Sequence, residues 1–497
     1  MISWRDGDGE VRRGSLFAAF AALSRGEAWS FPALRPHQRE PWHAFTVQVA
    51  ALALIRAGLD EPPTDEVAWR DLLLALTPDH PGGEAWELVV DDWSKPALLQ
   101  PPVVTAARRS EYKTALLTPD AFDVLVTSKN HDLKQERMAE ASEEDWLFAL
   151  ITLQTASAYG GAKTYGASRM NGKTGSRLMV RVRPRGGAGA AFQRDVRLLA
   201  SSAQGEGERK ALLWLEPNDG EVPLPHHTLA PSLYVDCARR VRLLRQNGRV
   251  EARYATAEKA RVNADAYAGK TGDPYAPIKP EGDASVTPKR RTFGYRGISE
   301  LFAAPLPLMA KCHTTDDPQG LRVSFSALVR RGGTDTNTDG FFERVIPTSR
   351  VEELYEYGPE VIFDRVGKAA RVRTDEAGEA RQRLRRALIS LFQGGPDQPR
   401  WTDDAAGKKA DPWTQRFDVA VDRDFFDDEL WAEAAGKAVA PRRMWRERLR
   451  VIAGEVFAQA AEAAPRTEMR RIRAVARSRS MLDAELRKWL GGVADGE

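Results

Sequence analysis

Glycine and basic residues are concentrated in residues 158–177, which read AYGGAKTYGASRMNGKTGSR. Five glycines and four basic residues occupy these twenty positions, and no acidic residue interrupts them. Glycine has no Cβ, so its backbone N–H groups can approach a phosphate or a groove edge closely. Lys163, Arg169, Lys173 and Arg177 would each neutralise a phosphate and release counterions. The stretch therefore predicts a loop that binds nucleic acid, with an unliganded surface loop as the alternative.

A second stretch with ligand-like residues reads GGTDTNTDGFFERVIP. Its Asp335, Asn337, Asp339 and Gly340 match positions one, three, five and six of a calcium-binding loop. Position twelve of such a loop needs a bidentate glutamate, and Ile346 stands there instead. Because aspartate and asparagine also favour turns, a polar hairpin tip is the alternative and the preferred prediction.

The remaining residues capable of metal or nucleotide chemistry do not form a known pattern. None of the seven histidines belongs to an HExxH motif or a paired Cys/His spacing. The tripeptide Asn130-His131-Asp132 would suit a metal-dependent nuclease or phosphohydrolase, but such a site needs further ligands at defined spacing. The glycine-rich stretch lacks GxxxxGK[ST] and does not follow a strand. We therefore expect no bound metal and no cofactor.

The elements that position the glycine-rich stretch can be predicted from periodicity. The segment AFTVQVAALALIRAG has apolar residues at helical spacing. A helix over DWLFALITLQTA runs directly into the glycine-rich stretch, and RLMVRVRP follows it with the alternation of a strand. In that strand Arg181 and Arg183 share one face. The opening SWRDGDGEVRRGSL predicts a hairpin with Asp-Gly at its turn.

From about Thr374 the chain becomes helical. Apolar stripes around Leu384, Trp445 and Leu482, together with a helix over DRDFFDDELWAEAAG, give four amphipathic helices separated by Gly/Pro breaks. Such a series favours an antiparallel four-helix bundle. The expected fold class is α+β, with a large mixed domain over residues 1–370 and the bundle over 371–497.

Composition bounds the class of protein. Of the 497 residues, 42% are hydrophobic and 29% charged, which is ordinary for a soluble globular protein. The polar start of the sequence is not a secretory signal, and no apolar run is long enough to span a bilayer. The two cysteines, Cys237 and Cys312, build neither a disulfide framework nor a four-cysteine zinc site. We expect an intracellular, cytoplasmic protein.

Charge is distributed unevenly along the chain. Residues 51–100 carry three basic and ten acidic side chains, whereas residues 151–200 carry nine basic ones and only Asp195 as an acid. This polarity is typical of a protein that binds a polyanion through one region, with chance clustering of surface charge as the alternative. Arg442, Arg443 and Arg446 in the bundle are either further phosphate contacts or ordinary surface charges.

Several short motifs, taken in order, carry a family resemblance. The series TPDAFDVLVTSKNHD, LQTASAYGGAKTYGASRMNGKTGSR, GDPYAPI and ALVRRGGTDTNTDGFFERV, followed by a helical bundle, resembles the CasA family. CasA is the large subunit of the type I-E CRISPR Cascade surveillance complex. The resemblance runs over most of the chain, and SRMNG (Ser168–Gly172) and GDPYAP (Gly272–Pro277) are its most specific parts.

The resemblance implies a binding function without catalysis. CasA proteins recognise the protospacer-adjacent motif in double-stranded DNA from the minor groove and help to open the duplex, so that guide RNA pairs with the target strand. The implied partners are guide RNA, target DNA, the other Cascade subunits and a recruited helicase–nuclease.

The resemblance also implies roles for individual residues. The motif-binding loops would be Lys129, Asn130 and His131 within Ser128–Lys134, and Gly160, Gly161, Ala162 and Lys163, where Ala162 and Lys163 dilute the family's glycines. The wedge that splits the first base pairs would be Thr336, Asn337 and Thr338, with Thr338 replacing the family's glutamine. A family lysine near the motif has two candidates, Lys259 and Lys270.

Two alternatives remain open on the residues alone. A metal-dependent nuclease or phosphohydrolase would use Asn130, His131 and Asp132 together with the loop around Asp335 and Asp339, and would show metal-dependent turnover. A scaffold protein with no nucleic-acid function would show no salt-dependent DNA binding.

Overall fold

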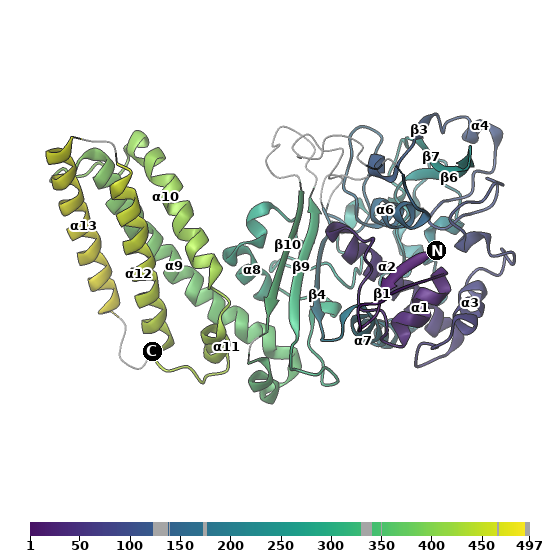
Figure 1. The fold of residues 1–497 in the computed structure, drawn as a ribbon, viewed down its shortest axis with the longest axis horizontal. Helices are drawn as coiled ribbons and strands as arrows, with labels where there is room; N and C mark the ends of the chain where they lie inside the picture. Colours follow the sequence, from purple (N-terminus) through teal and green to yellow (C-terminus); the bar gives the residue numbers. More distant parts are fainter. Residues whose placement is uncertain are drawn as a thin grey trace. The chain divides into compact units, whose positions relative to one another are not determined.

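The structure is a computed structural model that describes residues 1–122, 138, 140–171, 176–329, 340–348, 350–464 and 467–492. Its contacts divide the chain into two compact units (Figure 1). The first unit comprises Met1–Phe293 and Ala304–Ile346, and the second comprises Gly294–Ala303 and Pro347–Glu497. Helix and sheet are mixed in the first unit and the second is helical, so the predicted α+β class is confirmed.

The core of the first unit is built around one buried helix. The helices of this unit within the described residues are α1 (Leu16–Ser24), α2 (Arg39–Ala57), α3 (Glu66–Ala75), α4 (Ala106–Arg109), α6 (Glu143–Ala156) and α7 (Gly187–Ser202). Every residue of α2 from Glu40 to Leu54 is buried, and the helix packs against α6 and α7. Full burial explains why this segment is apolar on all sides rather than on one stripe. The predicted helix there, and the one that precedes the glycine-rich stretch, are confirmed.

The sheets of the first unit are small and mostly antiparallel. Strands β10, β9 and β4 form one sheet in that order, β3, β7 and β6 form another, and β1 pairs with β2. The predicted hairpin and the predicted strand RLMVRVRP are confirmed as β1–β2 and β4. The strands are β1 (Ile2–Arg5), β2 (Val11–Gly14), β3 (Thr114–Leu116), β4 (Leu178–Arg183), β5 (Leu224–Pro225), β6 (Arg240–Gln246), β7 (Arg249–Ala255), β8 (Val262–Asn263), β9 (Arg322–Val329) and β10 (Gly340–Pro347).

The second unit is the expected bundle with one helix reassigned. Its helices are α8 (Tyr295–Phe302), α9 (Ile362–Gln393), α10 (Asp404–Arg423), α11 (Asp428–Ala434), α12 (Pro441–Glu462) and α13 (Glu468–Leu490), and α9 packs against α10, α12 and α13. The long partner is α10, not DRDFFDDELWAEAAG, which forms only the short α11. Pro412 lies inside α10, and because proline usually ends a helix, the sequence pattern did not predict a helix there.

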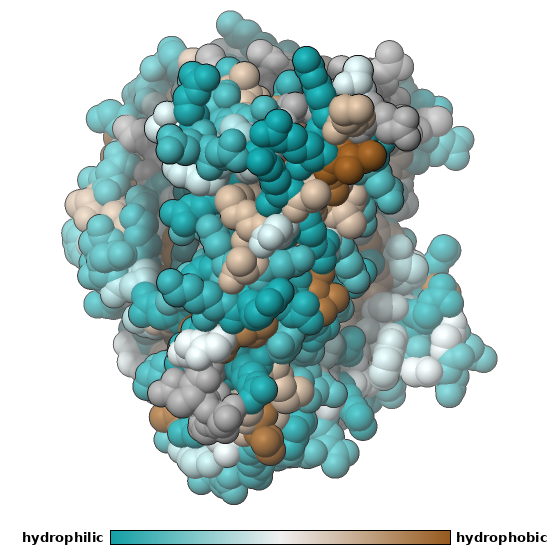
Figure 2. Space-filling model, turned by 90° about the vertical axis from the view of Figure 1, so that its left-hand side faces the viewer, coloured by the Kyte–Doolittle hydropathy of each residue, from teal (hydrophilic) through white to brown (hydrophobic). Residues whose placement is uncertain are grey.

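Figure 2 shows one face of the molecule, on which hydrophilic residues predominate and hydrophobic residues form small, separate spots. Exposed apolar side chains of the second unit are correspondingly scattered over several helices, as with Val419 on α10, Val451 on α12 and Met469 on α13. Among the residues that the structure describes, no helix is both long and apolar enough to cross a membrane.

Candidate nucleic-acid interface

Residues 160–164 of the glycine-rich stretch form a tight turn at the surface. The N–H of Gly160 donates to the carbonyl of Thr164 (2.8 Å), and the N–H of Thr164 donates to the carbonyl of Gly161 (3.0 Å). Gly161 and Lys163 both have positive φ, at 124° and 62°. Ala162 and Lys163 at the tip are exposed. We call residues 160–164 the glycine turn.

The glycine turn rests on a second loop from a distant part of the sequence. The N–H of Ala257 donates to the carbonyl of Lys163 (2.9 Å), and the Tyr165 hydroxyl donates to the carbonyl of Glu258 (2.7 Å). Two further N–H groups, of Glu258 and Lys259, donate to the carbonyl of Gly220. Lys259 therefore lies two residues after Ala257, which contacts the turn directly, and the Lys259 side chain is exposed.

Lys163 is ion-paired with Glu258 at the tip of the turn. Both side chains are more than half exposed, so the pair is screened by solvent and contributes little to stability. The negative charge of Glu258 matters more than the strength of the pair, because a carboxylate at this position repels an approaching phosphate. A phosphate that displaced Glu258 would restore a full charge–charge contact for Lys163.

Beneath the turn, the SRMNG motif anchors the stretch to the core. Ser168 donates to the buried carboxylate of Asp236 from its N–H (2.5 Å) and its hydroxyl (2.7 Å). Arg169 donates to the carbonyls of Pro231 (2.9 Å) and Tyr234 (2.6 Å), and its guanidinium lies 3.6 Å from the centre of the Tyr234 ring. Burial raises the pKa of Asp236, which the hydrogen bonds from Ser168 oppose. The motif therefore fixes the backbone next to the turn.

The GDPYAP motif makes the matching anchor for the other end of the stretch. Arg177 and Asp273 form a bidentate ion pair at 2.7 and 2.9 Å, and each side chain is 1% exposed. Although burial disfavours its charge, Asp273 has a pKa below its usual range because Arg177 and Arg169 lie beside it. The N–H of Val180 donates to the carbonyl of Tyr275, which ties this motif to β4.

The burial of Arg169 and Arg177 corrects one prediction. Both were expected to contact phosphate, and both are interior residues whose guanidinium groups donate to protein oxygens. Lys270 is exposed, and its ammonium donates to the carbonyl of Gly282 (3.0 Å). Of the basic residues of the first unit that were predicted to touch phosphate and that the structure describes, Lys163, Lys259 and Lys270 remain at the surface.

The other predicted contacts lie outside the described residues. These are Lys129, Asn130, His131 and Asp132 in one segment, Lys173 in another, and Asp335, Thr336, Asn337, Thr338 and Asp339 in a third. Their roles stay predictions. The described residues that flank the first and third of these segments nevertheless show how the chain enters and leaves them.

The 3₁₀ turn η1 (Pro36–Gln38) lies between those flanking residues. Arg35, just before η1, donates to the buried Asp120 (2.6 Å), which also accepts the N–H of Met138 (3.0 Å). His37 within η1 lies beside Phe341, at the start of β10, with ring centres 6.3 Å apart. Described residues that flank 123–137 and 330–339, namely Asp120 and Phe341, therefore both contact one short piece of chain.

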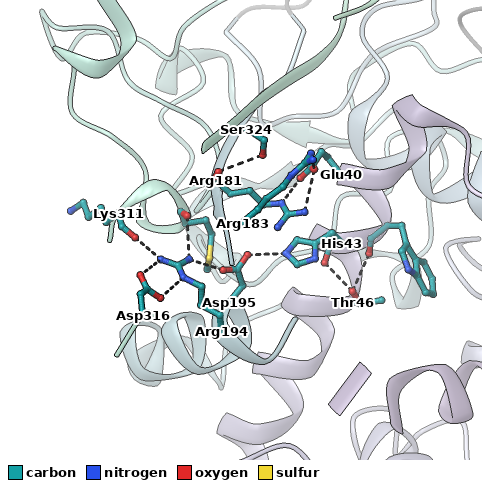
Figure 3. A network of polar contacts seen from close by, with 12 residues as sticks. Glu40, His43, Thr46, Arg181, Arg183, Arg194, Asp195, Lys311, Asp316 and Ser324 are labelled. Atoms are coloured by element: carbon teal, nitrogen blue, oxygen red, sulfur yellow. Dashed lines mark hydrogen bonds and ion pairs between the residues drawn. The ribbon is translucent and has the colours of Figure 1, made fainter. Parts of the chain in front are cut away.

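A network of charges fixes β4 and β10 to the start of α2, and Figure 3 shows it. Glu40 accepts from Arg181 (2.6 and 3.2 Å) and is also paired with Arg183, which in turn bonds Glu343 of β10 (2.8 Å). Burial raises the pKa of Glu40, but the two arginines outweigh it and hold the pKa well below its usual range. The prediction that Arg181 and Arg183 share a face is confirmed, and that face points inward.

Much of the positive charge of residues 151–200 is consequently interior and does not form a surface footprint. Arg194 continues the interior network, bonding Asp316 (2.6 Å) and Asp195 (2.8 Å), and Asp195 also bonds His43 (2.8 Å) (Figure 3). Guanidinium groups suit such sites because they keep their charge and offer several donors. The charge count alone did not distinguish paired interior arginines from exposed ones.

The bundle arginines are corrected in the same way. Arg446 is buried, with bonds to Glu376 (2.9 Å) and to the carbonyl of Trp489 (2.8 Å), and Arg442 pairs with Glu376 (3.1 Å). Arg446 therefore ties α12 to α9 and α13 instead of facing a phosphate. Arg443 is exposed.

No cluster of three or more His, Cys, Asp or Glu side chains suited to a metal ion occurs within the described part of the chain. In the calcium-loop pattern, Gly340 begins β10 and Ile346 is buried within that strand, where the twelfth ligand would be needed. Sequence reasoning did not single out Glu258, because it lies 95 residues from Lys163 and belongs to no motif.

Solved structures resemble the chain over nearly its whole length. A CasA of Thermus thermophilus has a TM-score of 0.66 at 15% identity and covers 98% of each chain. A CRISPR-associated protein Cse1 of Acidimicrobium ferrooxidans has a TM-score of 0.63 at 14% identity, over 99% of this chain and 97% of that one. A chain of a CRISPR RNA-guided surveillance complex has a TM-score of 0.57 at 18% identity, over 97% of each.

No protein-family model and no curated protein sequence matches the chain. At such low identity the structural likeness speaks to the fold, and over this coverage it does so for both units. The chain has the fold of CasA, or Cse1, proteins, as the motif resemblance implied.

Proposed function

We propose that this chain is the non-catalytic large subunit of a type I-E CRISPR Cascade surveillance complex. In that role it recognises the protospacer-adjacent motif in double-stranded DNA, promotes duplex opening and R-loop formation, and docks a helicase–nuclease. Its partners are guide RNA, target DNA and the other Cascade subunits, and it acts in the cytoplasm without a cofactor of its own.

The observation that carries the proposal is the near-complete coverage of the fold likeness. A match over 98% of both chains includes the mixed unit and the bundle together, in the order and proportions of a CasA protein. One matched chain comes from a structure described as a CRISPR RNA-guided surveillance complex. Because a fold can host unrelated functions, the proposal also needs a site, and the glycine turn supplies the candidate.

The glycine turn has the geometry that the proposed contact requires. Ala162 is small and exposed. Apart from Gly161 and its two chain neighbours, no heavy atom of the described residues lies within 4 Å of a Cβ added to Gly161, so the backbone can approach a groove closely. Lys163 and Lys259 supply positive charge on the same surface. Phosphate contacts of this kind give affinity and register, while base-edge contacts give sequence preference.

In the proposed opening of the DNA duplex, the segment 330–339 acts as the wedge. Inserting its tip beneath the motif unstacks the first base pairs at a cost of a few kcal/mol, which pairing of the guide RNA then offsets. The strand ends on either side, Val329 and Gly340, belong to a sheet held by the Glu40 network, and that rigid base supports a wedge that pushes against DNA.

The test is binding of a guide-loaded complex to duplex DNA with and without Lys163→Ala in this chain. Loss of one phosphate contact weakens binding several-fold at every flanking sequence and lowers the slope of log affinity against log salt by about one. Glu258→Gln has the opposite effect, since it removes the competing carboxylate. Fluorescence anisotropy over a salt series measures both.

The matched control is Lys95→Ala. Lys95 is an exposed lysine that also pairs with a carboxylate, that of Glu84, in the same unit but away from the motifs. Unchanged affinity and salt slope in Lys163→Ala, or equal changes in Lys95→Ala, would remove the glycine turn from the interface.

A further inference from the structure

A cleft of about 430 Å³ opens in the first unit between the start of α2, the start of α7 and the segment around Trp29. Its volume falls in the range of small-molecule sites. None of the residues predicted to bind DNA lines it. Its lining combines exposed arginines with aromatic and apolar side chains, so both its charge and its shape restrict what can fill it.

Positive charge in the cleft exceeds negative charge. Among the described residues that line it are Arg39, Arg181, Arg183 and Arg322, and Glu40 is the one carboxylate. Glu40 is already engaged by Arg181 and Arg183.

The surplus charge belongs to Arg39 and Arg322. Both are exposed, and neither forms an ion pair or a side-chain hydrogen bond with any residue in the described ranges. Arg39 is also the first residue of α2, where the helix dipole disfavours a cation. An anion in the cleft would stabilise both arginines.

Three buried donors on the cleft lining point to the same chemistry. Arg181 Nη1, Arg183 Nε and Trp42 Nε1 are buried N–H groups without an acceptor among the residues that the structure describes. The Arg181 side chain is 9% exposed and Trp42 is 3% exposed, so these groups are withdrawn from water. Figure 3 shows Arg181 and Arg183 side by side against Glu40. The residues that line the cleft therefore carry N–H groups that no acceptor among the described residues satisfies, which adds to the positive charge of the wall.

An exposed aromatic ring forms one edge of the cleft. Trp29 is 51% exposed, which is unusual for so large an apolar side chain. The position of Trp29 depends on a glycine at residue 187. A Cβ on Gly187 would lie 2.6 Å from the Trp29 carbonyl oxygen and 2.9 Å from its ring, closer than a side chain allows. Gly187, with φ of 73°, and the hydrogen bond from the Ala188 N–H to the Trp29 carbonyl hold the tryptophan beside the start of α7.

We infer that this cleft binds a nucleotide, with its phosphate on Arg39 and Arg322 and its base stacked on Trp29. The ligand is either a free mononucleotide or one unit of a single strand, which share the same phosphate and base chemistry. Aromatic stacking beside basic groups is the usual way in which proteins hold unpaired nucleotides regardless of sequence. The inference does not depend on the proposed function, because it concerns the isolated chain and DNA without a motif.

The test is binding of a fluorescent ten-residue oligothymidylate to the full chain, followed by anisotropy. Trp29→Ala weakens binding by about five- to a hundredfold, the range for loss of one base–aromatic stack. Arg322→Gln lowers the slope of log affinity against log salt by about 0.7, as expected for one phosphate contact on a single strand. Thermal unfolding of each variant checks that these exposed positions leave the fold intact.

The controls are Trp401→Ala, an exposed tryptophan of the second unit, and Arg249→Gln, an exposed arginine of β7. Both bind like the wild type. Thymidine monophosphate that displaces the oligonucleotide identifies a free nucleotide as a sufficient ligand. Failure to displace it, with binding still lost in Trp29→Ala, identifies a unit of a strand.

Two results would overturn the inference. One is an unchanged affinity in Trp29→Ala and Arg322→Gln, or a loss no greater than in the controls. The other is displacement of the probe by inorganic phosphate as effectively as by thymidine monophosphate, which would mean that the cleft recognises an anion and not a base.

Discussion

Arg177 and Lys163 belong to the same glycine-rich stretch and were expected to do the same thing. One is interior and joined to Asp273 by two hydrogen bonds, whereas the other is more than half exposed at the tip of a turn. Sequence could not separate them, because each partner is remote in the chain and only the fold brings it close. SRMNG and GDPYAP, the most specific parts of the family resemblance, contain residues that anchor the fold through such remote partners.

At this scale we predict that Arg177→Ala destabilises the first unit by about 3–5 kcal/mol. The substitution leaves the Asp273 carboxylate buried without its partner. Chemical denaturation measures the change in the free energy of unfolding. Lys163→Ala is the comparison, with a change within about 1 kcal/mol, since its ion pair is exposed. Similar stabilities of the two variants would contradict the assignment of Arg177 to the interior.

At the scale of elements, the spacing of apolar residues predicted those helices and strands whose apolar residues recur regularly. Periodicity predicted α2, α6 and β4, and the Asp-Gly turn predicted the hairpin. Periodicity missed α10, which contains Gly407 and Pro412. It also gave no hint of η1, because a 3₁₀ turn of three residues has no periodicity to read. That short turn and the residue before it nevertheless contact Asp120 and Phe341, which flank two segments predicted to contact DNA.

The contact of α8 with α9 gives a test of packing between elements. A Cβ on Gly367 of α9 would lie 2.8 Å from the backbone of Phe302, whereas among the described residues a Cβ on Gly378 would meet only the Arg296 guanidinium at 3.8 Å. We expect Gly367→Ala to destabilise the second unit by about 1–3 kcal/mol through overpacking. Gly378→Ala should stabilise it by about 0.5–1 kcal/mol, because alanine favours a helix. Denaturation of both variants measures this, and equal effects would contradict the close approach of α8.

The attachment of residues 123–137 gives a second test at this scale. Asp120→Asn removes the charge that binds Arg35 and weakens the bond to the Met138 N–H. We expect faster hydrogen exchange at the Met138 amide, by about ten- to a hundredfold, the equivalent of about 1.5–3 kcal/mol for a charged hydrogen bond. Asp65→Asn, which loosens the cap of α3, is the control and should leave Met138 unchanged. An unaltered Met138 rate in Asp120→Asn would mean that Asp120 does not hold this segment.

The whole molecule joins a mixed unit, packed with internal ion pairs, to a helical bundle. Apolar periodicity predicted that the chain divides into two kinds of structure, and motif order predicted the CasA fold. Neither indicated that α8 would join the second unit although residues on both sides of it belong to the first. Such a crossing depends on contacts between distant segments, which local sequence patterns do not encode.

The interior ion pairs predict the response of the whole molecule to acid. Although burial disfavours their charge, the pKa values of Glu40, Asp195 and Asp273 lie below the ordinary range because their partners are cationic or donate hydrogen bonds. Groups with lowered pKa contribute fully above about pH 4 and lose that contribution as the pH falls toward their folded values. Asp236, with a raised pKa, acts in the opposite direction.

We therefore expect the thermal unfolding midpoint to fall between about pH 5 and pH 3. The three lowered carboxylates outnumber the two carboxylates with raised pKa values among the described residues, Asp236 and Glu433. Calorimetry at constant ionic strength measures the midpoint. A midpoint that stays level or rises over this interval would show that the pairs around Glu40 and Asp273 do not persist in solution.

The most direct measurement of the central claim is binding of a guide-loaded Cascade complex to target duplexes with a randomised flanking motif, with and without this chain. We predict that the chain confers selection of particular flanking sequences, and that both Asn130→Ala and Lys163→Ala weaken binding to the selected sequences. Binding that is equally tight and equally unselective without the chain would contradict the account.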